Sequence, residues 1–193
     1  MKPVLFHLFG IPFHTWGIAA ATGFCAVALL AMRRAKAQGV STNRIADLLF
    51  FGAILGLVGA RLGYFATHGE ELTSLSAFIN PRIGGASMYG AAIAIFPLFF
   101  LFCRKNRLHP KNMADIFSPA LAVGLAIHRL GCLGTGCCYG KTCDLPWAIE
   151  LHGQLVHPTQ LYEAIPLTVL ALTLGWKWSK RVFLGQITWW FAI

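Results

Sequence analysis

The chain has 193 residues, of which 56% are hydrophobic and 12% are charged, with a mean hydropathy of +0.62 and a formal net charge of +9. Soluble domains carry about 25% charged residues, so the composition excludes an ordinary soluble protein and indicates an integral membrane protein. The positive charge does not indicate nucleic-acid binding, because the basic residues form clusters between apolar runs and no basic stripe interleaved with aromatic residues.

Six apolar runs define the predicted membrane spans. Five of them are close to the roughly 20 residues that cross a bilayer as a helix, and the sixth covers about half of that length. The runs comprise residues 11–31, 45–66, 85–103, 113–131 and 158–176, and residues 183–193 begin the sixth. We therefore predict an all-α fold, a polytopic bundle of about six to seven transmembrane helices. It is expected to be one transmembrane domain over residues 1–193, truncated within its sixth span.

The basic residues between these runs predict the orientation in the membrane. Eleven of the 16 Lys and Arg residues follow the first, third and fifth runs: Arg33, Arg34, Lys36, Arg44, Arg104, Lys105, Arg107, Lys111, Lys177, Lys180 and Arg181. The other five are Lys2, Arg61, Arg82, Arg129 and Lys141. Cytoplasmic loops carry the excess of positive charge, so the amino terminus is expected outside the membrane.

Residues 128–144, HRLGCLGTGCCYGKTCD, contain four of the six cysteines and are predicted to lie at the outer end of the fourth run. Local disulfides are one interpretation, because the outer face is oxidising. Small, buried, free cysteines packed against glycines are another. A metal site with His128, His152 and His157 as further ligands is a third. The spacing C-x4-C-C-x4-C disfavours it, because adjacent cysteines rarely ligate one ion without strain. We therefore predict no metal and no cofactor.

Two arginines near the outer ends of apolar runs are candidate phosphate ligands. Arg61 lies in GARLGYF and Arg129 in the cysteine segment. Each guanidinium either anchors its helix at headgroup depth or binds an anion, and its planar fork matches phosphate oxygens. Glu163 in HPTQLYE is costly in a membrane unless it is paired, so Arg61 or Arg129 is its expected partner. Whether Glu163 is structural or catalytic stays open at this point.

Three further positions complete the candidates. Asp47 and Asp115 are predicted toward the inner side, where they are expected to be structural residues at helix starts with cations nearby. Gly90, at the start of the third run, lets either another helix or a lipid headgroup approach the backbone closely.

The order of these motifs resembles the prolipoprotein diacylglyceryl transferase family. The motifs are GARLGY, GGASMYGAAIA, ADIFSPALAVGLAIHRLG followed by CYGK, and HPTQLYE. The resemblance implies a multi-pass enzyme of the bacterial inner (plasma) membrane with its active site facing the periplasmic side. Such an enzyme transfers the diacylglyceryl group of phosphatidylglycerol to the lipobox cysteine thiol of a prelipoprotein, in lipoprotein biosynthesis. The implied partners are phosphatidylglycerol, the prelipoprotein signal peptide and the lipid bilayer, with no nucleic acid.

The resemblance also implies roles for individual residues. Arg129 matches the arginine of the family's Gly-Arg-x-Gly-Asn signature, and Arg61 matches that of its Gly-Arg-Leu-Gly motif. His157 matches the histidine of the His-Pro-Ser/Thr-Gln motif and, with Arg129, is expected to be catalytic. The other expected substrate-binding positions are Gly131, Cys132, Gly140, Gln160 and Glu163.

The chain departs from the family pattern at chemically important positions. Tyr89 occupies the place of the His-Gly-Gly histidine, the usual candidate base, so Tyr89 is a candidate catalytic residue and His128 or His157 is a remaining candidate base. The signature's two asparagines and its glutamate are Cys132, Thr135 and Cys137. A tyrosine of the first span is Trp16, and an arginine-bearing helix of the family would lie beyond Ile193.

Several hypotheses therefore concern the cysteine loop. Cys137 or Cys138 is a candidate thiol acceptor or redox switch, and Cys137 is counted among the catalytic candidates. Alternatively, a disulfide such as Cys132–Cys143 braces the loop. At the level of the whole protein, the alternatives to a transferase are a membrane thiol-redox or metal-binding protein on the same scaffold, and an inactive lipid-binding paralogue.

Overall fold

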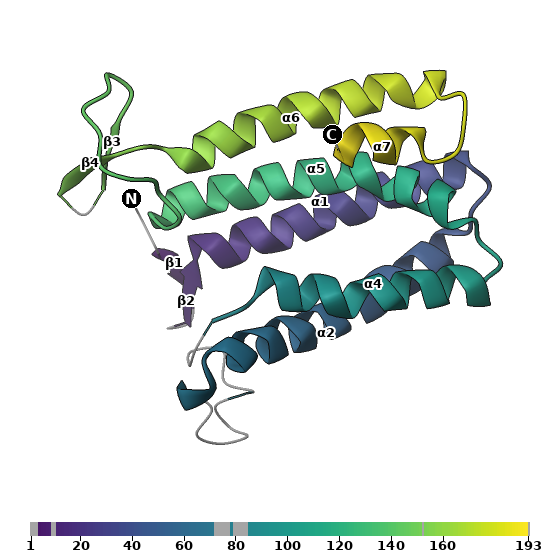
Figure 1. Ribbon diagram of the computed structural model, residues 1–193, viewed down its shortest axis with the longest axis horizontal. Coiled ribbons are helices and arrows are strands. Elements are labelled where there is room, and N and C mark those ends of the chain that lie inside the picture. The colour runs from purple at the N-terminus through teal and green to yellow at the C-terminus, as the bar shows by residue number, and fades with distance from the viewer. Residues whose placement is uncertain (1–3, 9–10, 72–77, 79–84, 152, 193) are drawn as a thin grey trace. The chain divides into compact units, whose positions relative to one another are not determined.

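A computed structural model of the protein describes residues 4–8, 11–71, 78, 85–151 and 153–192 (Figure 1). These residues form six α-helices, two antiparallel strand pairs and two short 3-10 helices. In chain order the elements are β1 (Val4–Leu8), β2 (Ile11–His14), α1 (Thr15–Ala37), α2 (Thr42–Thr67), η1 (Gly69–Glu71), α4 (Met88–Lys105), α5 (Pro110–Thr135), β3 (Ile149–Leu151), β4 (Gln154–Val156), α6 (Thr159–Lys177), η2 (Trp178–Lys180) and α7 (Gln186–Ala192).

Four of the helices, α1, α2, α4 and α5, are long and apolar enough to cross a membrane. They correspond to the first four predicted runs, so the helical class and the membrane character of the chain are confirmed. The predicted fifth run is α6, a helix of 19 residues that falls outside this group. Its first turns carry Gln160 and Glu163, which lower its hydropathy.

The strands were not predicted, and the start of the first run is a correction. Residues Ile11–His14 form β2, paired with β1, and helix α1 begins only at Thr15. An apolar run alone does not distinguish a short strand from a helix, and Pro12 disfavours helical backbone at the residue before it. The rings of Phe6 and Phe13 stack across the strand pair with centroids 5.0 Å apart.

The chain divides into two compact units. The first unit comprises Met1–Ala37 with Ala114–Ile193, and the second unit comprises Gln38–Met113. Each unit is described by itself.

In the first unit, small residues bring α1 and α5 into close contact. A Cβ atom added to Gly23 of α1 would lie 3.1 Å from the carbonyl oxygen of Gly124 in α5, and one added to Gly134 would lie 2.7 Å from Thr15. Small residues allow helix backbones to approach in a membrane, where the hydrophobic effect does not drive helices together. The spacing of these residues therefore fixes how α5, which leads into the cysteine loop, lies along α1.

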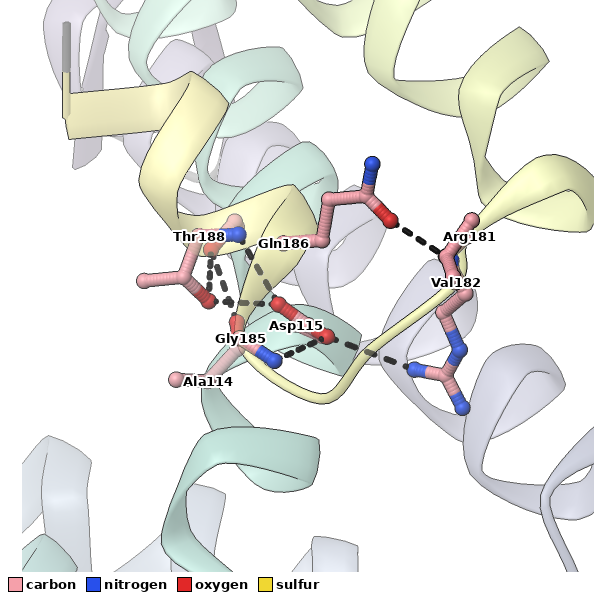
Figure 2. Close-up of polar contacts among 8 residues, drawn as sticks. Ala114, Asp115, Arg181, Val182, Gly185, Gln186 and Thr188 are labelled. Carbon is pink, nitrogen blue, oxygen red and sulfur yellow. Dashed lines mark hydrogen bonds and ion pairs between the residues drawn. The ribbon is translucent and has the colours of Figure 1, made fainter.

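The buried carboxylate of Asp115 joins α5 to the start of α7 (Figure 2). Asp115 is 0% exposed and accepts hydrogen bonds from the backbone N–H groups of Gly185 and Thr188, each at 2.8 Å, and from the Thr188 hydroxyl at 2.9 Å. The Arg181 guanidinium is 3.5 Å away. The predicted structural role beside a cation is confirmed. The helix start that Asp115 stabilises is that of α7, which follows it by 70 residues in the chain.

The same end of the first unit carries a group of cations on tryptophan rings. The pairs are Arg34 and Arg181 with Trp178, at 5.1 and 4.6 Å from the ring centroid, Lys177 with Trp190 at 3.5 Å, and Lys180 with Trp176 at 4.1 Å. Cations over aromatic faces are attracted by the ring quadrupole. We call this set the basic end of the first unit; the cysteine loop follows the opposite, carboxyl-terminal end of α5 (Figure 1).

In the second unit, glycines pack α2 against α4. A Cβ atom on Gly59 would lie 2.6 Å from the carbonyl oxygen of Gly90, and a Cβ atom on Gly63 would lie 2.7 Å from the Cα atom of Gly90. Gly90 is therefore a helix-packing residue, one of the two interpretations that its position left open. Asp47 lines a cavity of about 310 Å³ together with Lys105, in agreement with the expected nearby cation.

Candidate functional site

Eight of the ten predicted site residues lie in the first unit, and Arg61 and Tyr89 lie in the second. The eight come from the end of α5, the loop after it and the start of α6: Arg129, Gly131, Cys132, Cys137, Gly140, His157, Gln160 and Glu163. Elements that are separate in the sequence thus converge at one end of the first unit, which we call the loop end.

The ion pair at the loop end joins α5 to α6. Arg129 Nη2 lies 2.5 Å from Glu163 Oε2, which confirms one of the two partners expected for Glu163. The side chains are 28% and 47% exposed, so neither charge is sealed in the protein. A guanidinium has five N–H donors, and among the described residues Glu163 is the one ionic partner of Arg129. The remaining donors are available to an anion.

Side chains at the start of helix α6 form hydrogen bonds with backbone carbonyl groups of the cysteine loop. Gln160 Nε2 donates to the carbonyl oxygen of Cys137 at 2.6 Å, and the Thr159 hydroxyl donates to that of Cys138 at 2.7 Å. Gly140 N–H donates to the carbonyl oxygen of His157 at 3.0 Å. A Cβ on Gly140 would lie 2.8 Å from His157 Cβ and 2.9 Å from Thr159 Cγ2, so this position requires glycine for the close approach.

Gln160 has an additional feature that points to a ligand. The residue is 0% exposed, and within the described part of the chain its Oε1 atom has no hydrogen-bond partner. A buried acceptor without a donor costs about 1–3 kcal/mol, so such an atom is normally satisfied by water or a ligand. The Oε1 atom of Gln160 is therefore a buried, unsatisfied acceptor next to the cysteine loop.

His157 lies in a short chain of polar aromatic groups. Its Nδ1 atom is 3.3 Å from the hydroxyl of Tyr162, and that hydroxyl accepts a hydrogen bond of 2.7 Å from Trp147 Nε1. Because the Tyr162 oxygen already accepts from Trp147, its hydrogen is free to point at His157 Nδ1. In the neutral imidazole this arrangement places the hydrogen on Nε2, which can donate a hydrogen bond at that atom.

His128, the other candidate base, is oriented by Trp16. Trp16 Nε1 donates to His128 Nε2 at 3.2 Å, so a neutral ring carries its hydrogen on Nδ1. Nδ1 lies 4.0 Å from the sulfur of Cys132. Both nitrogens of His128 are thus directed at protein groups.

The cysteines of the loop are free thiols, and three of them form a cluster. The sulfur atoms of Cys132, Cys137 and Cys138 all lie within 4.8 Å of one another. Every one of the six cysteines, all of which fall in the described ranges, is unpaired, and Cys143 is outside the cluster. The disulfide suggested for Cys132 and Cys143 is therefore wrong for this structure: the loop folds Cys132 toward Cys137 instead.

The pKa of the Cys138 thiol is subject to opposing influences. Partial burial of this thiol raises its pKa, and hydrogen bonding and charge from Cys137 raise it further. The positive charge of Arg129 acts on that pKa in the opposite direction. Arg129 and the thiol cluster are therefore close enough to influence one another electrostatically.

Gly131 has a packing contact that its predicted role did not include. A Cβ atom there would collide with the Cβ of Ala19 in α1. The residue thus keeps α5 close to α1 directly before the loop. The suggestion that Gly131 binds substrate stays a prediction.

In the second unit, Arg61 and Tyr89 have different surroundings. Arg61 is 8% exposed, donates to the carbonyl oxygen of Gly85 at 2.9 Å and lies over the Phe65 ring at 5.7 Å. Tyr89 is 78% exposed at the start of α4. His152, named as a possible metal ligand, lies outside the described residues.

Several residues that contribute to the loop end were not predicted from the sequence. Trp147 and Tyr162 orient His157, and Thr159 holds the carbonyl of Cys138. A signal existed for Thr159 and Tyr162, which belong to the quoted motif HPTQLYE. Trp147 had no signal, because a tryptophan at headgroup depth is ordinarily an interface anchor.

Comparison with known proteins gives a match along nearly the whole chain. Residues 3–193 match the family profile described as prolipoprotein diacylglyceryl transferase. The chain is 37% identical over 190 residues to the phosphatidylglycerol–prolipoprotein diacylglyceryl transferase of Finegoldia magna, covering 97% of this chain and 77% of that protein. The proteins of the same name from Clostridium tetani and Aeromonas hydrophila are 30% and 31% identical over 197 and 196 residues, covering 97% of this chain and 78% and 72% of theirs. Both units and the cysteine loop fall within the matched region.

Proposed function

The chain belongs to the prolipoprotein diacylglyceryl transferase family, and on that premise we propose that it transfers the diacylglyceryl group of phosphatidylglycerol to the cysteine thiol of a prelipoprotein. In this reaction the acceptor sulfur attacks the glycerol carbon that carries the phosphate. A carbon–sulfur bond forms, the carbon–oxygen bond breaks, and glycerol phosphate leaves with the electron pair. The family match over residues 3–193 is the observation that carries this proposal.

Arg129 is the proposed ligand of the donor phosphate. Its guanidinium is partly exposed, and its contact with Glu163 leaves N–H donors for a second anion. A cation fixed beside the leaving group stabilises the negative charge that develops there in the transition state. Glu163 then serves as a positioning residue, because it holds the guanidinium in place from the side of α6.

The other predicted site residues take supporting roles in the proposal. The unsatisfied Oε1 of Gln160 suits a hydroxyl of the glycerol headgroup, and Gly131 and Gly140 permit close approach of the elements that form the loop end. His157 is proposed as a hydrogen-bond donor, through Nε2–H, to the departing phosphate. On the basis of the family resemblance, Arg61 is proposed as the second ligand of the donor phosphate. Tyr89, in the place of the family histidine, is proposed as a catalytic residue.

We also propose a topology. The chain is a single transmembrane domain of six to seven spans in a bacterial inner membrane, with its amino terminus outside and the loop end facing the periplasm. The basic end of the first unit supports this orientation, because an excess of Lys and Arg marks the cytoplasmic side and the loop end lies at the other end of the same helices.

A transfer assay tests the reaction. Radiolabelled phosphatidylglycerol and a lipobox peptide are incubated with the purified chain in detergent, beside the variants Arg129→Ala and Arg129→Lys. We expect label on the peptide, and Arg129→Ala to lower its rate by about 100- to 1,000-fold, as the loss of one transition-state donor does. Arg129→Lys should retain part of the activity. Arg33→Ala, which removes an exposed arginine at the other end of α1, is the matched control and should leave transfer unchanged.

The results separate the reaction from the role of Arg129. No transfer by the wild-type chain, despite binding of phosphatidylglycerol, would rule out the proposed reaction. Transfer that is equal in wild type and Arg129→Ala would leave the reaction standing and remove Arg129 from the phosphate site.

Thiol labelling of intact cells tests the topology. A membrane-impermeant maleimide, added after a chelator has removed any metal bound to thiols, should label the wild-type chain at Cys137 and Cys138, which are exposed at the loop end. The double variant Cys137→Ser/Cys138→Ser should lose the label at these two positions, and only Cys143 of the loop should retain label. Labelling that requires lysis of the cells would place the loop end in the cytoplasm and reverse the proposed orientation.

A further inference from the structure

The cluster of Cys132, Cys137 and Cys138 has no role in the chemistry described above. Cys132 is buried at the end of α5, and the other two thiols follow it across one turn of the loop. We propose that these three thiols bind a thiophilic metal ion of the Zn²⁺ class through three thiolates, leaving a fourth coordination position open. At that position the metal binds the acceptor thiol; this last part rests on the proposed function.

The sulfur positions fit ligands that share one ion. Zinc–sulfur bonds of about 2.3 Å place the sulfurs of a tetrahedral site about 3.8 Å apart. The sulfurs of Cys137 and Cys138 are 3.7 Å apart, and all three lie within 4.8 Å of one another. Small rotations of the thiol groups therefore suffice to bring all three sulfurs to one ion.

The backbone resolves the objection raised by adjacent cysteines. Gly136 and Cys138 have φ angles of 78° and 61°, and the second is in the left-handed region that residues with a Cβ rarely adopt. Backbone strain of this kind persists where the surroundings fix it, and it gathers at functional sites. The hydrogen bonds from Gln160 and Thr159 to the carbonyls of Cys137 and Cys138 supply that restraint. The unusual turn directs two consecutive thiols toward Cys132.

The charge around the cluster suits a metal held by thiolates. Three thiolates and a divalent cation carry one net negative charge, and the positively charged Arg129 lies three residues before Cys132 on α5. His128 directs Nδ1–H toward the Cys132 sulfur, because Trp16 occupies Nε2. A donor of this kind stabilises a metal-bound thiolate from outside the coordination sphere. His128 is thus oriented as a hydrogen-bond donor to the cluster and not as its fourth ligand.

The fourth coordination position of the metal ion would be available to a substrate. Within the searched part of the chain, the metal-binding group consists of these three cysteines and no fourth His, Asp or Glu. Zinc sites with three protein ligands keep a position for substrate, and a coordinating thiol is deprotonated outright. The acceptor thiol would release its proton to water on binding. Its sulfur would then form the bond to the glycerol carbon while the phosphate leaves toward Arg129. The metal would thereby activate the acceptor thiol without the His-Gly-Gly histidine of the family, whose place Tyr89 takes in this chain.

Cobalt titration tests the metal site without measuring transfer. The purified chain in detergent is reduced, freed of metal with a chelator and titrated with Co²⁺ without oxygen. We expect thiolate-to-cobalt charge-transfer absorption that saturates at one ion per chain and is displaced by Zn²⁺. Cys137→Ser and Cys138→Ser should each weaken binding by more than about 100-fold, beyond the 10- to 100-fold loss caused by changes outside the coordination sphere. Cys143→Ser, which alters a loop cysteine outside the cluster, is the matched control and should bind as the wild type does.

The fourth position has its own readout. Adding a lipobox peptide should shift the cobalt spectrum, whereas the same peptide with serine in place of cysteine should not. A shift with neither peptide would overturn the open position. The absence of a charge-transfer band, or an equal band in Cys137→Ser and Cys138→Ser, would overturn the metal site. Loss of two free thiols on oxidation with no cobalt binding would do the same and identify a redox pair.

The two proposals fail separately. Cobalt binding without transfer in the reconstituted Zn²⁺ form would leave the metal site standing and remove the proposed reaction. Undiminished transfer in Cys137→Ser, or after chelation, would leave the reaction standing and remove the metal from it.

Discussion

The two ends of the first unit each contain an ion pair between segments that are far apart in the sequence, and the pairs differ in how completely their groups are satisfied. At the basic end, the Asp115 carboxylate is 0% exposed and is surrounded by Arg181, two backbone N–H groups and a hydroxyl. At the loop end, Arg129 and Glu163 are 28% and 47% exposed and have each other as ionic partners within the described residues.

The difference separates a structural ion pair from one that can serve a ligand. A carboxylate whose two oxygens both accept hydrogen bonds from the protein has no acceptor available for a ligand. Removing this carboxylate would leave buried donors unsatisfied. A guanidinium with one carboxylate partner and access to solvent retains donors for a phosphate. The same pairing of Asp or Glu with Arg therefore stabilises the fold at one end and prepares a site at the other.

The largest expected effect on stability comes from Asp115. Asp115→Ala should lower the free energy of unfolding by about 3–5 kcal/mol, because it removes the carboxylate that satisfies the buried N–H groups at the start of α7 and that pairs with the largely buried Arg181. Thermal or denaturant unfolding in detergent measures the change. The exposed Asp144→Ala is the control and should stay within about 0.5 kcal/mol of the wild type. A loss below 1 kcal/mol for Asp115→Ala would contradict the structural role of this pair.

A glycine at the loop end comes next. Gly140→Ala should cost about 1–3 kcal/mol, because the new Cβ overlaps His157 and Thr159 and the loop has to move. Unfolding in detergent measures this cost, and Gly17→Ala provides the contrast. Nothing lies within 4 Å of a Cβ at Gly17 in α1, so alanine there should be neutral or stabilising. Equal stability of the two variants would show that Gly140 is not needed for close packing.

The hydrogen bond that orients His128 should contribute less. Trp16→Phe retains an aromatic ring but removes the N–H donor to His128 Nε2, and should cost about 0.5–1.5 kcal/mol. The more specific readout is the imidazole tautomer, observed by nitrogen NMR of labelled histidine. We expect the Nδ1–H form to predominate in the wild type and to lose that preference in Trp16→Phe. An unchanged tautomer distribution would argue that Trp16 does not set it.

Arg129 gives the smallest expected effect on stability. Arg129→Ala should lower the free energy of unfolding by no more than about 1 kcal/mol, as exposed ion pairs do. Unfolding of Arg129→Ala and Asp115→Ala under identical detergent conditions compares the two ends directly. A loss for Arg129→Ala as large as that for Asp115→Ala would remove the distinction between them.

Much of the fold could be predicted from the chain because hydrophobicity acts locally. The runs at 45–66, 85–103 and 113–131 correspond closely to α2, α4 and α5. The family resemblance of the ordered motifs is confirmed by the match over residues 3–193. The start of the first run was wrong, because Ile11–His14 pairs with β1 and this pairing depends on another segment of the chain.

The site was predictable in part, for a related reason. The residue types of Arg129 and Glu163 indicated that an intramembrane carboxylate needs a cation, but two arginines were equal candidates, and the fold selects Arg129. For the cysteines, spacing favoured a disulfide or isolated thiols over a metal site. Spacing carries no information about the left-handed turn at Cys138, which directs adjacent thiols to one side.

The helical membrane class, the family and the separation of basic from less basic loops could all be predicted from the amino-acid sequence, because hydropathy, charge and motif order are properties of single segments. Which charges pair, which glycines pack helices and which thiols meet became clear from the folded chain alone. These outcomes depend on distances between segments far apart in the chain, such as the 70 residues between Asp115 and Gly185 or the 23 between Gln160 and Cys137. A buried polar group is stabilised only by the partner that packing places within hydrogen-bond reach.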